Sequence, residues 1–349
     1  MKYDFNDILI EPAELTDIVS RSEISVYYQN GFLPIFTAPM DTVVSTENLK
    51  FFRKNKIKTI VPRTTWVPMA NITFKEGDFV ALGITEFKDF ITLHQSLKAN
   101  ILVDIANGHM SELLELTKKA KEKFGKNLTL MVGNVANPKT YELLSEAGAD
   151  YIRIGIGNGG GCLTTVQTGV GYPMASLIKE CYDVSCTLKN PAKIVADGGF
   201  KNYSDIIKAL ALGADYVMLG SILNKALESA GDTYLENIKK DGWTEPGERV
   251  NQYAKQTEEL FKYGTKMFKK FRGMSTKEAQ RAMGKTELKT SEGVTRIQPV
   301  EYTLEGWCDN FKSYLSSAMS YSNARTLDEF IGKAKCNLIT TNSFNRFNK

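Results

Sequence analysis

The stretch that decides the fold lies at residues 100–135, NILVDIANGHMSELLELTKKAKEKFGKNLTLMVGNV. It contains two short apolar runs, at residues 100–108 and 128–135, in which most apolar residues are consecutive rather than alternating. Such runs are typical of parallel strands that are covered on both faces. Between them, residues 111–124 place leucines on one face of a helix and lysines on the other. The stretch therefore predicts a strand, a helix and a second strand.

The same unit recurs along the chain. Six further apolar runs predict strands at residues 33–40, 58–64, 79–84, 150–157, 192–199 and 215–221. Residues 203–214 predict another helix, which ends at a glycine. Eight strands that alternate with helices favour an α/β fold of the closed (β/α)8 TIM barrel type. An open doubly wound sheet stays as the alternative, but no G-x-G-x-x-G follows the first predicted strand.

Two long segments interrupt this rhythm. Residues 222–272 form an insertion after the eighth predicted strand and are rich in Lys, Glu and Tyr, with GWTEPGE (242–248) predicted as a turn. Residues 273–306 lack a clear period and predict a mobile flap. Both leave the barrel at the carboxyl ends of the strands, where barrel enzymes bind their substrates. We expect residues 1–349 to form a single catalytic domain that includes both segments.

The composition excludes several classes of protein. Apolar residues make up 42% of the chain and charged residues 24%, a balance typical of a globular protein. A net charge of +4, from 44 basic and 40 acidic residues, gives no reason to expect nucleic acid as a partner. No apolar stretch approaches the roughly 20 residues of a membrane span. Five cysteines without a C-x-x-C pair favour a reduced, cytoplasmic protein.

The densest chemical signal is GIGNGGGCLTTVQTGVGYP (155–173), directly after the sixth predicted strand. Its glycines let the backbone approach a ligand, and its backbone groups could hold a phosphate or coordinate a cation. The alternative is a plain flexible turn. Cys162 would be a small buried side chain in most loops, but in this one it is the candidate nucleophile. Thr164 could deliver a proton, or could merely cap the next segment.

Two further groups of polar residues and glycines follow predicted strands. Residues 197–199 (DGG) end the seventh strand and residues 220–221 (GS) end the eighth, the two positions where barrels commonly bind phosphate. Asp104 and Asn107 follow the fourth strand and could bind amides or hydroxyls of a cofactor, although D-x-x-N-G is also an ordinary turn sequence.

Two other kinds of site lack the residues that they need. The two histidines, His94 and His109, stand alone, so neither a metal cluster nor a Ser–His–Asp triad is supported. No G-x-x-x-x-G-K-[ST] is present, which argues against a P-loop phosphotransferase.

Taken together, these pieces resemble the IMP dehydrogenase/GMP reductase family, and its GMP reductase branch more closely. The resemblance covers most of the chain outside the insertion and the C-terminal tail. It rests on YDFNDILIEP (3–12), PMDTV (39–43), VDIANG (103–108), MVGNV (131–135), the cysteine loop, ADGG (196–199), YVMLG (216–220), GMS (273–275) and SEG (291–293).

The resemblance implies NADPH-dependent reductive deamination of GMP to IMP and ammonia, through a covalent thioimidate between a cysteine and purine C2. It implies Cys162 as the nucleophile, with Thr164 and Glu292 handling the leaving ammonia. The implied substrate-binding residues are Met40, Gly160, Asp197, Gly198, Gly199, Gly220, Ser221, Met274, Ser275, Lys289 and Gly293. The implied cofactor-binding residues are Arg63, Asp104, Ala106, Asn107 and Asn134. The family likeness also implies a homotetramer, and K⁺ is a candidate ligand of Gly157, Gly159 and Cys162.

Three features favour the reductase over IMP dehydrogenase, which converts IMP to XMP with NAD. TGVGYP (168–173) looks like the reductase sequence, and the stretch from GMS to SEG is short and lacks an Arg-Tyr pair. The chain also has no room for an inserted regulatory domain.

Other positions depart from the family pattern. Gly160 stands where a serine is usual, Arg63 where a lysine is usual, and Lys289 where an arginine is usual. These departures leave open a deoxy or modified purine nucleotide as the substrate. A purine-nucleotide binder without catalysis is the alternative from another class, and the set of Cys162, Thr164 and Glu292 argues against it.

Overall fold

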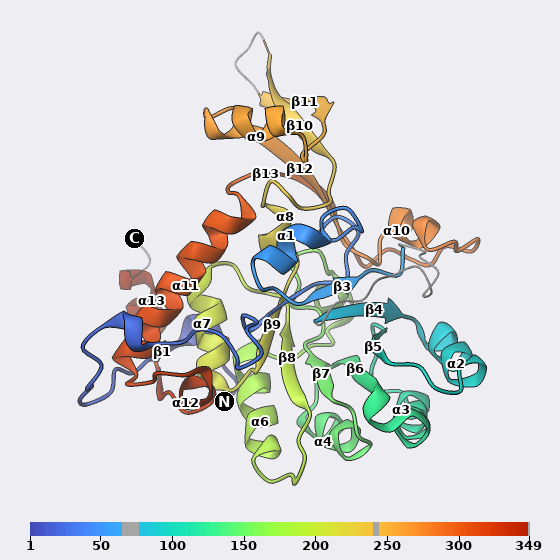
Figure 1. Cartoon of the computed structure of the whole chain (residues 1–349), viewed down its shortest axis with the longest axis vertical. Coiled ribbons are helices and arrows are strands. Elements are labelled where there is room, and N and C mark those ends of the chain that lie inside the picture. Colours follow the sequence, from blue (N-terminus) through green and yellow to red (C-terminus); the bar gives the residue numbers. More distant parts are fainter. Residues whose placement is uncertain (65–76, 240–243, 348–349) are drawn as a thin grey trace.

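Eight parallel strands form the centre of the molecule (Figure 1). The computed structural model describes residues 1–64, 77–239 and 244–347. The barrel strands are β2 (Ile35–Thr37), β3 (Thr59–Val61), β4 (Asp78–Leu82), β5 (Ala99–Asp104), β6 (Leu128–Val135), β7 (Tyr151–Ile154), β8 (Lys193–Asp197) and β9 (Tyr216–Leu219). Their order in the sheet is β2-β9-β8-β7-β6-β5-β4-β3. A parallel bridge between Phe36 and Lys58 joins its two edges, so the barrel closes between β2 and β3.

Helices cover the outside of this barrel. They are α1 (Leu49–Lys54), α2 (Ile84–Leu93), α3 (Ser111–Phe124), α4 (Pro138–Glu146), α6 (Met174–Ser185), α7 (Tyr203–Leu212) and α11 (Leu304–Tyr321). All eight predicted strands and the two predicted helices are confirmed. In α3, Leu113, Leu116 and Ala120 are buried against the barrel, while three of its lysines, Lys118, Lys119 and Lys123, are exposed. The helix α7 ends at Gly213, whose φ of +119° is one that glycine adopts freely.

The core has two main layers. The larger one fills the space between the strands and the helices. The smaller one lies inside the barrel and contains Phe36, Phe79, Leu102, Met131, Val195, Tyr216 and Met218. This filled interior makes the barrel a packed core rather than a channel, so ligands have to bind at its ends.

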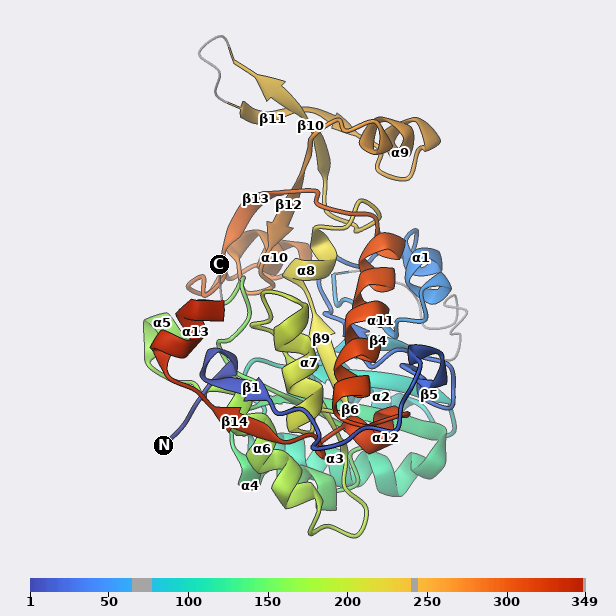
Figure 2. The same ribbon diagram turned by 90° about the vertical axis from the view of Figure 1, so that its left-hand side faces the viewer.

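The insertion and the flap together form a second, antiparallel sheet after β9. Its strands are β10 (Thr233–Ile238), β11 (Thr244–Val250), β12 (Met267–Arg272) and β13 (Thr295–Pro299), in the order β11-β10-β12-β13. The short helices α8 (Ser221–Asn224), α9 (Lys255–Lys262) and α10 (Lys277–Ala282) lie in the same segment. Figure 2 shows β10, β11 and α9 projecting beyond the barrel, with β12 and β13 leading back to it.

The structure corrects two expectations for this segment. Residues 244–248 of the predicted GWTEPGE turn belong to strand β11, and Gly242 and Trp243 lie outside the described residues. Pro246 and Gly247 are tolerated because β11 is an edge strand with a register shift against β10. The flap, expected to lack regular structure, contains α10, β13 and the start of α11. Its elements are too short for their period to be visible in the sequence.

The two ends of the chain meet on the outside of the barrel. The strand β1 (Ile8–Ile10) pairs antiparallel with β14 (Cys336–Leu338), close to α12 (Leu327–Phe330) and α13 (Thr341–Phe347) (Figure 2). Short 3₁₀ helices occur at η1 (Phe5–Asp7), η2 (Arg21–Glu23) and η4 (Gly125–Asn127). Within the described ranges, no helix has the length and apolar character that crossing a bilayer requires.

Candidate active site

The cysteine loop is held by backbone pairing with the flap. Cys162 forms an antiparallel bridge with Gly293, the N–H of Leu163 donates to the carbonyl of Glu292 at 2.7 Å, and the N–H of Val294 donates to the carbonyl of Gly161 at 3.1 Å. A Cβ on Gly273 would lie 2.4 Å from the carbonyl oxygen of Gly161. The GMS and SEG segments therefore pack directly on the loop, at a distance that only glycine permits.

This pairing places three reactive side chains in a row. The thiol of Cys162 donates to Oγ1 of Thr164 at 3.2 Å, and that hydroxyl donates to Oε2 of Glu292 at 2.6 Å. Cys162 is a free, half-buried cysteine, and Thr164 opens the short helix α5 (Thr164–Thr168). In both hydrogen bonds, the acceptor is the group on the side of the Glu292 carboxylate. A proton can therefore leave the sulfur by way of the hydroxyl, which is the arrangement of an activated nucleophile with its base.

A buried arginine that the sequence did not single out connects two of the predicted residues. Arg153, on β7, forms ion pairs with Asp104 on β5 and with Asp197 on β8. Burial by itself would lower the pKa of Arg153, but the carboxylates of Asp197 and Asp104 hold it above its ordinary value. Asn134 Nδ2 also donates to Asp197, at 2.6 Å. The bonds that Asp197 accepts from Arg153 and Asn134 all use its Oδ2. Among the described residues, none donates to its Oδ1, which can therefore accept from a ligand hydroxyl.

The turns after β8 and β9 meet the cysteine loop, as the phosphate-site prediction requires. A Cβ on Gly198 would lie 2.9 Å from Cα of Gly159, and one on Gly199 would lie 3.0 Å from the carbonyl oxygen of Asn158. Both of these glycines have positive φ, 79° and 86°.

Two more predicted residues border the same region. A Cβ on Gly220 would lie 2.9 Å from Sδ of Met40, and one on Gly160 would lie 3.5 Å from Oγ of Ser221. All the predicted phosphate-side residues thus gather at the carboxyl end of the barrel.

Gln280, another residue that the sequence analysis missed, ties the flap together. Its Nε2 donates to the carbonyls of Ser275 and Lys289, both at 3.1 Å, and its Oε1 accepts from the N–H of Lys289 at 2.8 Å. Gln280 is buried in α10, and Met274 precedes Ser275 on the same segment. No motif in the sequence indicates this role, because Gln280 reaches Ser275 and Lys289 only when the segment folds around α10.

The predicted cofactor residues lie beside Asp104. Arg63 Nη1 donates to the backbone carbonyl of Asp104 at 3.4 Å, and its Nη2 pairs with Glu86 at 3.1 Å. Ala106 and Asn107 are exposed. Asn134 is turned toward Asp197 and toward the carbonyl of Gly155, which it contacts at 2.8 Å. Of the five residues, Ala106 and Asn107 are thus the most accessible.

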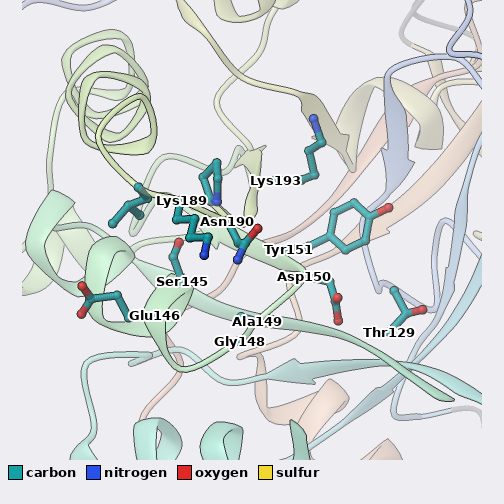
Figure 3. A pocket seen from close by; sticks show the side chains of 12 residues that line it. Thr129, Ser145, Glu146, Gly148, Ala149, Asp150, Tyr151, Lys189, Asn190 and Lys193 are labelled. Atoms are coloured by element: carbon teal, nitrogen blue, oxygen red, sulfur yellow. The ribbon is translucent and has the colours of Figure 1, made fainter. Parts of the chain in front are cut away.

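A cavity of about 790 Å³ lies at the opposite, amino-terminal end of β6, β7 and β8 (Figure 3). Asp150, Tyr151, Lys189, Asn190 and Lys193 are among its lining residues. None of the predicted site residues lines it. The reactive row of Cys162, Thr164 and Glu292 is therefore separated from this cavity by the packed barrel interior.

The fold and the site define a class of protein: a TIM-barrel enzyme with a thiol at the carboxyl end of its strands. A model of the IMP dehydrogenase / GMP reductase domain matches residues 75–242. The chain is 33% identical over 351 residues to GMP reductase 2 of Homo sapiens, covering 94% of this chain and 92% of the human protein.

Two further relatives come from distant organisms. GMP reductase of Photobacterium profundum is 31% identical, covering 96% of this chain and 94% of that protein. GMP reductase of Phytophthora infestans is 30% identical, covering 94% and 88%. The chain therefore belongs to the IMP dehydrogenase/GMP reductase family, and it is an oxidoreductase.

Proposed function

We propose that the protein reduces GMP to IMP and ammonia with NADPH, through a covalent bond between Cys162 and purine C2. The observation that carries this proposal is the row from the Cys162 thiol through the Thr164 hydroxyl to the Glu292 carboxylate, with bonds of 3.2 and 2.6 Å. The GMP reductases named above support GMP as the substrate.

The residues of the row would act in sequence. The Cys162 thiol gives its proton to the Thr164–Glu292 pair, and the thiolate adds to C2 of GMP. The same pair returns the proton to the 2-amino group, which leaves as ammonia when the C–N bond breaks and the thioimidate remains. NADPH, when bound, supplies the hydride that reduces C2. The C–S bond then breaks, and Cys162 leaves as a thiolate from IMP.

The other predicted residues would hold the substrate. Asp197, whose Oδ1 is available, would accept from the ribose hydroxyls, and Met274, Ser275, Lys289 and Gly293 would bind the base. The phosphate would lie among Gly160, Gly198, Gly199, Gly220 and Ser221, beside Met40. Glycines expose backbone N–H donors to the phosphate oxygens, and the Ser221 hydroxyl is a further donor.

The cofactor residues fit a nicotinamide nucleotide. Buried Nε of Arg63 and Oγ1 of Thr64 have no hydrogen-bond partner in the part of the chain that the structure describes. Both are donors that a carboxamide or a phosphate could satisfy. Arg63 with Asp104, Ala106, Asn107 and Asn134 would hold NADPH or, as the alternative, NAD.

A K⁺ ion at Gly157, Gly159 and Cys162 belongs to the same proposal. Gly157, with φ of +79°, marks a sharp turn next to the thiol. The carbonyl of Gly159 already accepts the N–H of Cys162 at 2.9 Å, which leaves it one lone pair for a cation. We further propose a cytoplasmic homotetramer in which each chain, with its insertion and flap, forms one catalytic domain.

Purified protein tests the proposal directly. With GMP and NADPH together it should consume NADPH and release ammonia in equal amounts over many turnovers, which neither nucleotide alone should support. Cys162→Ala should abolish both signals, whereas Cys186→Ala, which changes an exposed cysteine outside the site, should keep them. Full turnover by Cys162→Ala would exclude the covalent route.

Substrate choice is tested in parallel. Reduction of NAD with IMP would instead indicate a dehydrogenase. Faster turnover of deoxy or modified purine monophosphates than of GMP would move the assignment to one of those nucleotides.

A further inference from the structure

Arg296, on β13, is a cation at the phosphate end of the proposed site. It is not one of the predicted substrate-binding residues. Its Nη1 donates to the carbonyl of Gly160 at 3.3 Å. A Cβ added to Gly160 would lie 3.5 Å from Nη2 of Arg296 and 3.5 Å from Oγ of Ser221. The guanidinium and the hydroxyl therefore border the same space, the one that a side chain at position 160 would enter.

The guanidinium is held in this place by the second sheet. In the register of β12 and β13, Arg296 is opposite Phe271. Its Cζ lies 4.8 Å from the ring centroid of Phe271, a cation–π contact. Phe271 is 1% exposed, so the ring is a fixed platform. A stacked arginine of this kind loses less freedom on binding a ligand than a freely rotating side chain would.

The charge of Arg296 is not neutralised by any carboxylate of the described residues. Arg153 and Arg272 form ion pairs with aspartates, but no carboxylate pairs with Arg296 in the part of the chain that the structure describes. Arg296 is an exposed residue, beside a loop of glycines whose N–H groups can also bind an anion.

We infer that Arg296 binds the phosphate group of the nucleotide, in the place of the side chain that Gly160 lacks. The inference rests on the proposed function, because it takes the region of Gly160 and Ser221 as the phosphate end of the substrate. A guanidinium offers two parallel N–H donors to phosphate oxygens and carries a full charge, whereas a serine offers one neutral donor. The site is accordingly selective for a phosphorylated purine over the free nucleoside.

Calorimetric titration of the full-length protein with GMP, IMP and guanosine tests this role without requiring turnover. Arg296→Ala should bind GMP and IMP about 10- to 100-fold more weakly, the loss expected for a hydrogen bond to a charged group. Guanosine binding should stay the same. Turnover should show a raised KM and an unchanged kcat. The matched control is Arg249→Ala on β11, which removes another exposed arginine of the second sheet and should change no affinity.

A second variant separates the loss of the phosphate contact from any loosening of the second sheet by Arg296→Ala. The double variant Arg296→Ala/Gly160→Ser should regain about tenfold in GMP affinity, the gain expected for one hydrogen bond to a charged phosphate. The space at Gly160 accepts a Cβ at ordinary contact distance. Equal GMP affinity in Arg296→Ala and wild type would overturn the inference, and so would equal losses for GMP and guanosine. A loss confined to the nucleotides, in a protein that fails to reduce GMP, would support the inference while refuting the proposed function.

Discussion

Glu292 is the residue on which the proposed proton transfer depends. Glu292→Gln keeps the size of the side chain but replaces the proton acceptor opposite Thr164 with an amide. We expect ammonia release to fall by about 10²- to 10⁴-fold, the usual contribution of a general acid–base group, while GMP binding persists. Single-turnover measurement of ammonia checks this. Glu287→Gln, at an exposed position in the same flap, serves as the control. Equal rates in both variants would remove Glu292 from the mechanism.

Arg153 should govern stability as well as the shape of the site. Arg153→Met leaves the carboxylates of Asp104 and Asp197 facing each other without their cation. Breaking a buried ion pair from one side costs about 3–5 kcal/mol, so the free energy of unfolding in urea should fall by that order. Arg153→Lys, which keeps a charge, should lose less. A loss below about 1 kcal/mol in Arg153→Met would mean that water replaces the guanidinium.

Arg153 and Arg296 were missed by sequence reasoning for the same reason. Cys162, Asp197 and Glu292 lie in short glycine-containing motifs, so their neighbours in the chain identified them. The two arginines lie within strands and contact partners that are far away in the sequence, Asp104 for Arg153 and the Gly160 carbonyl for Arg296. Such contacts depend on which strands become neighbours, and a single sequence does not state that directly.

At the scale of elements, the barrel strands could be predicted because each is a buried parallel run of apolar residues. Residues 244–250 could not, because their strand is at an edge, carries a proline and a glycine, and is largely exposed. The α10 helix has six residues, fewer than two turns, so no apolar period can appear in it. The apolar pattern thus found the barrel strands, and it missed this exposed edge strand and this short helix.

The strand β12 connects the second sheet to the barrel and should give the protein a measurable pH dependence. Its Lys269 is buried, with Nζ donating to the carbonyl of Ser229 at 2.6 Å. Burial lowers the pKa of Lys269 to about 7, although Glu228 and Asp232 act to raise it. In the unfolded chain, the pKa of a lysine is about 10.4. Between about pH 7 and about pH 10.4 the unfolded state therefore binds one more proton than the folded state does.

The sign follows from this difference. The contribution of Lys269 to stability is lowest and constant below about pH 7, and it increases as the pH rises toward about 10. Urea unfolding of wild type and Lys269→Met at several pH values measures it, because other titrations cancel in the difference. From about pH 7 upward, the free energy of unfolding should become more favourable to the folded state in wild type than in Lys269→Met. Parallel curves would show that Lys269 stays protonated in the folded state.

At the scale of the whole molecule, the residues of the candidate site gather at one end of the barrel. The carboxyl end carries the cysteine loop, the turns after β8 and β9, and the second sheet with Arg296. Inside, aromatic rings of β2, β7 and β9 pack around the ammonium of Lys58, which lies 5.4 Å from the ring centroid of Phe36, 5.3 Å from that of Tyr151 and 4.8 Å from that of Tyr216. This interior layer holds the strands whose ends position the reactive residues.

Phe36 is the residue through which that layer should control the stability of the whole fold. Its ring is fully buried and contacts Phe79, Tyr151 and Tyr216 at centroid distances of 5.4, 5.6 and 5.0 Å, on β4, β7 and β9. Its backbone also closes the barrel by bridging Lys58. Phe36→Ala should therefore lower the free energy of unfolding by about 3–5 kcal/mol, because the rings around it cannot collapse into the cavity.

In urea, we expect a single transition whose midpoint moves to lower concentration while the slope stays the same, as in the cooperative unfolding of one unit. Tyr263→Ala, at a side chain that is 89% exposed, should change the free energy by no more than about 0.5 kcal/mol. Two separate transitions in Phe36→Ala, with the second at the wild-type midpoint, would show instead that part of the barrel is stable without this layer. The active-site end would then not depend on the interior packing described above.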